Sequence, residues 1–210
     1  LWWPAERLLA FADLHFEKGS SYGRRGMLLP PYDTRATLLA MTAEIDRFDP
    51  ATVVCLGDSF HDLGAAARME RADLELLAAL AFRRDWIWIA GNHDAEIPPS
   101  LPGRVAEAIQ AREIVLRHRA DLAASAAEIS GHFHPKVSVR ANGKSVARRC
   151  FVEDGSRLVL PAFGAYTGGL DTLDAAFRPL FPRGFRAHAL GRRGVYSLPP
   201  TRFPPTGHGV

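Results

Sequence analysis

The chain has 210 residues, of which 47% are hydrophobic and 23% are charged, and its formal net charge is +3. This is the composition of an ordinary globular protein that is long enough to bury a core. No apolar run approaches the roughly 20 residues that span a bilayer, and no export signal is recognised, so we expect a cytoplasmic protein without a membrane partner. Both cysteines, Cys55 and Cys150, lie in apolar runs, which indicates reduced core residues.

Five short apolar runs, each ending in polar or glycine residues, predict strands. In chain order they are residues 7–15 (RLLAFADLH), 52–58 (TVVCLGD), 85–94 (DWIWIAGNHD), 112–118 (REIVLRH) and 127–134 (AEISGHFH). Between the first three runs, residues 34–48 and 65–82 have apolar positions recurring at three and four residues, which predicts helices. This alternation favours α/β layering, with parallel strands in the first half of the chain.

The second half of the chain has the pattern of strands alone. Residues 136–152 alternate polar and apolar side chains around Asn142-Gly143, a strong signal for a two-residue hairpin, and residues 157–163 and 195–198 predict further strands. We therefore expect an α/β fold in which two mixed sheets pack face to face, flanked by helices. Residues 1–198 are predicted to form a single domain, and the proline- and glycine-rich tail 199–210 to be disordered.

Basic residues gather in the C-terminal third, and arginine outnumbers lysine. They are Lys136, Arg140, Lys144, Arg148, Arg149, Arg157, Arg178, Arg183, Arg186, Arg192 and Arg193. The planar guanidinium group suits phosphate contacts, so this region is either a phosphate-binding surface or a solvated face.

Polar side chains follow the predicted strands at the points where the strands end. They are Asp13, His15, Asp58, Asn92, His93, Asp94, His118, His132 and His134. A single Asp after a strand is common turn chemistry, but ligands of open α/β sheets bind beyond the carboxyl ends of the strands, so five such ends predict one shared site. Carboxylate, amide and imidazole groups without thiolates suit Mn, Fe, Zn, Co or Ni. Seven candidate ligands exceed the needs of one tetrahedral zinc, which favours a pair of ions that activates water for phosphoryl displacement.

Some of these candidate residues have more than one interpretation. In the stretch GHFHP, Gly131 permits close backbone approach, which favours His132 and His134 as ligands. His118, between two arginines, is interpreted as a ligand, with an exposed strand residue or a phosphate contact as alternatives. His61 either supports His93 or is an exposed loop residue.

The motifs Asp13-Leu-His15, Gly57-Asp58, Gly91-Asn92-His93-Asp94, His118 and Gly131-His132-Phe-His134 resemble, in order and spacing over residues 7–135, those of the calcineurin-like metallophosphoesterases. The resemblance implies that Asp13, His15 and His134 hold one metal ion. It implies that Asn92, His118 and His132 hold a second ion, with Asp58 bridging the two. His93 would contact the scissile phosphate as an acid or a charge stabiliser. A four-layer α/β–β/α sandwich and two divalent ions are also implied, and we expect Mn²⁺, with Fe, Zn, Co or Ni as alternatives.

The runs DLHFEKG, GDSFHD and LLPPYDTR resemble a bacterial subgroup that is associated with a DNA ligase and a helicase in DNA damage response and is described as endonucleases. Residues 57–61 are also similar to the GD-x-F-H motif of double-strand-break repair nucleases. Protein phosphatases of the family have, three positions after the bridging aspartate, an Asp that orients the catalytic His. Here that position is His61, followed by Asp62, and either residue can support His93.

The leading prediction is therefore a metal-dependent phosphodiesterase that acts on DNA, with repair ligase and helicase proteins as partners. The alternative is a small-molecule phosphoesterase for nucleotides or a lipid-linked diphosphate. A non-catalytic binding module is disfavoured, because all eight expected positions are filled. Arg24 and Arg25, expected in a loop after the first metal motif, are candidate phosphate contacts.

Overall fold

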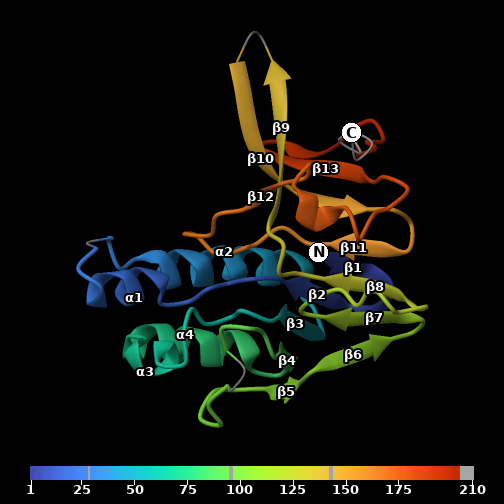
Figure 1. Cartoon of the computed structure of the whole chain (residues 1–210). Coiled ribbons are helices and arrows are strands. Elements are labelled where there is room, and N and C mark those ends of the chain that lie inside the picture. The colour runs from blue at the N-terminus through green and yellow to red at the C-terminus, as the bar shows by residue number, and fades with distance from the viewer. Residues whose placement is uncertain (28, 95–96, 142–143, 204–210) are drawn as a thin grey trace.

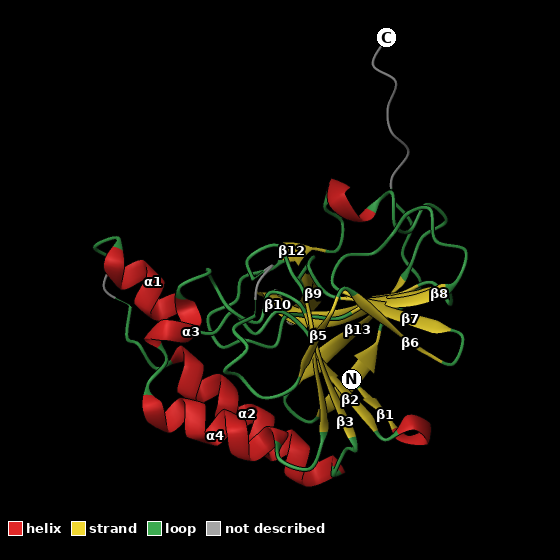
Figure 2. Ribbon diagram, turned by 90° about the horizontal axis from the view of Figure 1, so that it is seen from below, coloured by secondary structure: helices red, strands yellow, loops and turns green. Residues whose placement is uncertain are grey.

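The computed structural model describes residues 1–27, 29–94, 97–141 and 144–203. In these residues two mixed β-sheets face each other, and four α-helices lie on one side of the pair (Figures 1 and 2). This confirms the expected α/β fold with two mixed sheets. No helix in the described part of the chain is long and apolar enough to cross a membrane.

The first sheet contains five strands in the order β1-β2-β3-β4-β5. They are β1 (Trp2–Trp3), β2 (Leu8–Phe11), β3 (Thr52–Leu56), β4 (Asp85–Ile89) and β5 (Arg104–Ala106). The strands β2 to β5 are parallel to one another, and β1 pairs antiparallel with β2. The central strands are buried on both faces, which explains their continuous apolar sequences and confirms the predicted parallel arrangement.

Helices cover the outer face of this sheet. They are α1 (Lys18–Arg24), α2 (Asp33–Phe48), α3 (Ala65–Arg68) and α4 (Arg71–Ala81), preceded by the short 3-10 helix η1 (Pro4–Glu6). Leu38, Met41 and Ile45 of α2 form a buried stripe, and burial of each such side chain contributes about 1.5–3 kcal/mol. The single helix predicted over residues 65–82 is interrupted between α3 and α4, because Glu70 is extended, with φ −64° and ψ 145°.

The second sheet contains nine strands within the described residues. They are β6 (Ala108–Ala111), β7 (Ile114–Arg117), β8 (Ala127–Ser130), β9 (Pro135–Ala141), β10 (Lys144–Glu153), β11 (Arg157–Val159), β12 (Leu170–Asp171), β13 (Arg186–Gly191) and β14 (Gly194–Ser197). Their order is β12-β9-β10-β11-β8-β7-β6, with β13 paired to β10 and β14 to β13. The predicted hairpin is present as the antiparallel pair β9 and β10, whose last described partners are Ala141 and Lys144; Asn142-Gly143 lies outside the described residues.

A shared apolar core joins the two sheets. Alternate residues of β2, β3 and β4 point away from the helices, and Ala10, Val54 and Ile87 meet Leu116 and Ile129 of the second sheet. The first sheet is therefore covered by helices on one face and by the second sheet on the other. This packing brings the carboxyl ends of β2, β3 and β4 close to those of β7 and β8.

The expected second layer of flanking helices is not found among the described residues. The outer face of the second sheet is covered instead by the 3-10 helix η2 (Ala175–Phe177) and by phenylalanine side chains, including Phe181 and Phe185. Prolines at positions 179 and 182 interrupt this segment and prevent a longer helix. In the segment expected to be a disordered tail, the backbone of Thr201 pairs with Phe185, and residues 204–210 lie outside the described ones.

Candidate metal centre

The predicted site residues come from five loops at the carboxyl ends of strands. Asp13 and His15 follow β2, Asp58 follows β3, Asn92 and His93 follow β4, His118 follows β7, and His132 and His134 follow β8. Because the two sheets face each other, these ends meet at one edge. Asp13 and Asp58 are almost completely buried, whereas the side chain of His93 is 48% exposed. The site thus combines two buried carboxylates with one more accessible histidine.

A first cluster contains Asp13, His15 and His134. Nε2 of His134 lies 3.3 Å from Oδ1 of Asp13 and 3.4 Å from Nε2 of His15. The candidate ligand atoms of these three residues all lie within 4.8 Å of one another. Their spacing is therefore suited to a single metal ion.

A second cluster contains Asp58, His118 and His132, with the same mutual spacing. Nε2 of His118 lies 3.5 Å from Oδ2 of Asp58 and 3.1 Å from Nδ1 of His132. Asp58 also belongs to a third group, together with His15 and His93, so it lies between the two clusters. Its position is that of a carboxylate shared by two neighbouring ions.

The donor groups fit a metal ion because their lone pairs face one another. The carbonyl oxygen of Leu56 can only accept, so a neutral His118 carries its proton on Nδ1, 2.9 Å away. Its Nε2 is then an acceptor that faces the carboxylate of Asp58. Burial, together with neighbouring histidines, lowers the pKa of His15 to about 2, so the His15 ring is neutral. A divalent cation satisfies such a set of carboxylates and neutral imidazoles.

The backbone of the candidate ligands is left-handed at five positions. The φ angles of Asp13, His15, Asp58, His132 and His134 lie between 46° and 71°. Each such non-glycine residue costs on the order of 1–3 kcal/mol and needs support from its surroundings. The amide of His15 donates to the carbonyl of Asp58 at 2.9 Å, and the amide of His132 donates to the Asp13 carboxylate at 3.1 and 3.0 Å. The loops are thus held by hydrogen bonds beyond the ends of the strands.

Two glycines of the motifs are required by close packing. A Cβ on Gly57, whose φ is 73°, would lie 2.4 Å from Nδ1 of His118. A Cβ on Gly131 would lie 2.8 Å from Oδ2 of Asp13. Larger residues at either position would displace a candidate ligand.

Asp94 ties two of the loops together, a role that the sequence reasoning missed. Its Oδ1 accepts from the amides of Asp58 and Gly91 at 3.1 and 3.0 Å. Its Oδ2 accepts from the amides of Ser59 and Phe60 at 2.6 and 3.0 Å. The carboxylate is 1% exposed and points away from solvent, so it positions Asp58 rather than facing a substrate. The signal available in the sequence was an acidic residue directly after the candidate catalytic histidine.

The orientation of His93 depends on a backbone atom of His61. Nδ1 of His93 lies 3.0 Å from the carbonyl oxygen of His61, and the two rings stack at 5.4 Å. Asp62 instead makes two hydrogen bonds to Arg68, at 2.8 and 2.9 Å, which lower its pKa to about 2. Of the two predicted supports, His61 therefore contacts His93, and Asp62 binds α3.

The remaining predicted residues lie at the rim. Asn92 is exposed in the loop between Gly91 and His93. Arg24 is the last residue of α1, and Arg25 follows it directly, so the loop expected there is a helix end; both side chains are exposed. Lys18 at the start of α1 was not predicted, yet burial and this nearby lysine lower the pKa of His61.

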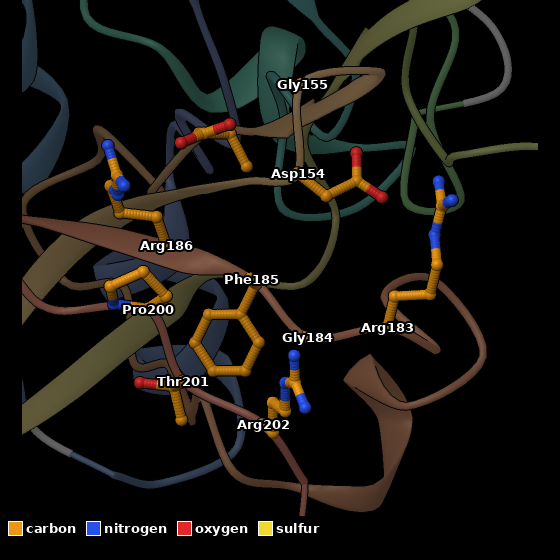
Figure 3. A pocket seen from close by; sticks show the side chains of 10 residues that line it. Asp154, Gly155, Arg183, Gly184, Phe185, Arg186, Pro200, Thr201 and Arg202 are labelled. Atoms are coloured by element: carbon orange, nitrogen blue, oxygen red, sulfur yellow. The ribbon is translucent and has the colours of Figure 1, made fainter.

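A separate cavity of about 450 Å³ lies where β13 begins. It is lined by Glu153, Asp154, Gly155, Arg183, Gly184, Phe185, Arg186, Pro200, Thr201 and Arg202. Figure 3 shows Arg183, Arg202 and the carboxylate of Asp154 around it. The cavity contains none of the candidate ligands, so it is distinct from the metal centre.

The two packed sheets carry Asp and His clusters at their shared edge, which is the arrangement expected of a metallophosphoesterase. A family model for calcineurin-like phosphoesterases matches residues 6–148, a stretch that includes every candidate ligand. The chain belongs to the calcineurin-like phosphoesterase family, and it is a hydrolase of that family.

Solved structures give two further comparisons. The chain is similar to the crystal structure of the nuclease MPE from Pseudomonas putida, at 31% identity and a TM-score of 0.72, over 94% of this chain and 90% of that chain. It is also similar to Yfce, a phosphoesterase from E. coli, at 14% identity and a TM-score of 0.45, over 91% of this chain and 97% of that chain. A search of curated proteins found no match.

Proposed function

We propose that the protein is a binuclear metal-dependent phosphodiesterase that cleaves DNA. The position of Asp58 between two clusters of three ligands carries this proposal, because a shared carboxylate is the feature expected of a two-ion centre. The nuclease assignment is supported by the 31% identity to the Pseudomonas putida nuclease over most of both chains. Damage response, with ligase and helicase proteins as partners, remains part of the proposal on the basis of the subgroup motifs.

In the proposed centre, Asp13, His15 and His134 would hold one ion, Asn92, His118 and His132 would hold the other, and both would share Asp58. Two divalent ions, for which Mn²⁺ is the expected metal, would supply Lewis-acid activation of the phosphodiester and of the attacking water. The hydrogen bond from His118 Nδ1 to the Leu56 carbonyl fixes which nitrogen of that ring is free to ligate.

His93 is proposed to act on the leaving oxygen of the substrate. Its Nδ1–H donates to the His61 carbonyl, which leaves Nε2 directed toward the site, 4.0 Å from Oδ2 of Asp58. A proton on Nε2 can be transferred from this position to the departing alkoxide. The exposure of the ring gives a bound substrate direct access to this nitrogen.

Basic residues of α1 are proposed to bind the substrate phosphates. Lys18 and Arg25 lie close enough to influence His61, which stacks on His93. Arg24 and Arg25 are exposed, so their guanidinium groups are available to the phosphates of a bound substrate. Basic side chains in these positions favour an anionic substrate such as a phosphodiester.

Cleavage of fluorescently labelled oligonucleotides by metal-stripped protein reconstituted with Mn²⁺ tests the nuclease assignment. The proposal predicts metal-dependent internal cleavage that is lost in Asp58→Ala. Hydrolysis of nucleotides or lipid-linked diphosphates without any DNA cleavage would favour the small-molecule phosphoesterase instead.

A further inference from the structure

The hairpin of β9 and β10 extends away from the body of the molecule (Figure 1). β9 begins at Pro135, directly after the candidate ligand His134. β10 joins β13 from Cys150 onward. Between these points the two strands pair with each other, from Lys136 with Arg149 up to Ala141 with Lys144. The described residues of this hairpin, 136–141 and 144–149, are called the arm below.

The arm has a uniform charge. It contains five basic residues and no acidic residue, namely Lys136, Arg140, Lys144, Arg148 and Arg149. Arg149 turns inward and donates to the carbonyl oxygens of Phe163 and Gly164 at 3.1 and 2.8 Å. Lys144 and Arg148 are exposed, and within the described residues neither forms an ion pair with a carboxylate. Their charges are available to an external anion.

Folding of the domain does not account for the outer part of the arm. Lys144, Ser145 and Ala147 are exposed. Ser138, opposite Ala147, is exposed as well, and its hydroxyl donates to Oδ2 of Asp171 at 3.0 Å, which marks the end of the anchored base. A two-stranded hairpin is at best marginally stable in water, so extending it into solvent gains little for the core. The anchored base, through Arg149 and the pairing with β13, holds the arm in a defined direction from the metal centre.

We propose that the arm binds the phosphate backbone of DNA several nucleotides away from the scissile bond. This inference rests on the proposed nuclease function and deepens it. The seven residues of β9 give a reach of about 23 Å at roughly 3.3 Å per residue. That length matches roughly seven phosphates along one strand of a duplex, spaced about 3.4 Å apart. The major groove of a duplex also admits a two-stranded ribbon.

The test uses the variant Lys144→Gln/Arg148→Gln and the control Arg47→Gln/Arg83→Gln. The control removes the same charge from two exposed arginines, one near the end of α2 and one just after α4. Binding of a labelled 20-base-pair duplex is measured by fluorescence anisotropy over a range of salt concentrations. This binding measurement does not depend on catalysis. Hydrolysis of bis-p-nitrophenyl phosphate, which is too small to reach the arm, is measured in parallel, and circular dichroism checks folding.

The arm variant is expected to bind DNA roughly tenfold more weakly at low salt, with a salt slope smaller by roughly two, while the control binds like the wild type. Its rate on the small diester is expected to be unchanged.

Equal binding by the arm variant and the wild type would overturn the proposal, as would an equal loss in the control. A dimer in the wild type that becomes monomeric in the arm variant, seen by light scattering, would instead identify the arm as a self-association surface. Failure to hydrolyse the small diester would count against the proposed function alone, because DNA binding reports on the arm independently.

Discussion

The imidazole of His93 is held by the backbone carbonyl of His61, at 3.0 Å from its Nδ1. A protein phosphatase of this family is expected to use an aspartate side chain near this position, and here the neighbouring Asp62 is engaged by Arg68 instead. A main-chain carbonyl can only accept, so this contact fixes the orientation of the ring and places a proton on Nδ1. The other ring nitrogen, Nε2, lies 4.0 Å from Oδ2 of Asp58 and so faces the candidate ligands.

Because the contact is made by a backbone atom, His61→Ala is expected to retain it. We expect this variant to lose less than tenfold in kcat, through the lost ring stacking, whereas His93→Ala loses roughly 10²–10⁴-fold. Both variants should keep the wild-type metal content, measured by inductively coupled plasma mass spectrometry. A His61→Ala variant as inactive as His93→Ala would show that the His61 side chain itself acts in the reaction.

Gly57 is expected to be indispensable for the second cluster. In Gly57→Ala, the new Cβ would collide with the ring of His118, so metal content per chain should fall and kcat with it. Gly155→Ala is a matched control, because Gly155 also has a positive φ, of 89°, but has open space around it. Both variants should lose on the order of 1 kcal/mol or more in stability from backbone strain. Equal metal content in the two variants would contradict the role assigned to Gly57.

Asp94→Asn is expected to lower the free energy of unfolding by roughly 2–4 kcal/mol. The amide nitrogen that replaces one oxygen cannot accept, so two buried backbone N–H groups lose their partner at a cost of about 1–3 kcal/mol each. Urea denaturation of the metal-free protein measures this loss directly. The exposed Asp85→Asn serves as control for the removed charge and should change stability by less than about 1 kcal/mol.

The ion pair between Asp62 and Arg68 predicts a specific acid sensitivity. The two hydrogen bonds from Arg68 lower the pKa of Asp62 from 3.8 to about 2 in the folded state. Its stabilising contribution is therefore complete above about pH 5 and is lost as the pH falls toward 2. The difference in Tm between the metal-free wild type and Asp62→Asn should be constant above pH 5 and should shrink below pH 4. A difference that persists unchanged to pH 2 would contradict this assignment.

Several features of the fold were predictable because they depend on side-chain pattern. The buried parallel strands appear in the sequence as continuous apolar runs, and α2 appears as a stripe that includes Leu38 and Met41. The helix α1 was missed, since its sequence KGSSYGR has two glycines and two serines and no apolar stripe. It is held instead by tertiary contacts, including a hydrogen bond from Arg68 to Ser20 at 2.9 Å.

The convergence of the candidate ligands was expected from their positions at strand ends, whereas the details that orient them were not. The left-handed backbone at Asp13 and Asp58, and the carbonyl that holds His93, are properties of the main chain, which residue identity does not encode directly. The prediction of helices on the outer face of the second sheet rested on the family resemblance. In this chain, prolines and phenylalanines cover that face without an α-helix in the described residues.

Hydrolysis of two chromogenic substrates tests the central claim most directly. Metal-stripped protein reconstituted with Mn²⁺ is assayed on bis-p-nitrophenyl phosphate, a diester, and on p-nitrophenyl phosphate, a monoester, alongside Asp58→Ala. The proposed phosphodiesterase predicts that the diester is cleaved much faster than the monoester, and that Asp58→Ala loses both metal and activity. A preference for the monoester, or full activity in Asp58→Ala, would contradict a phosphodiesterase built on a bridging aspartate.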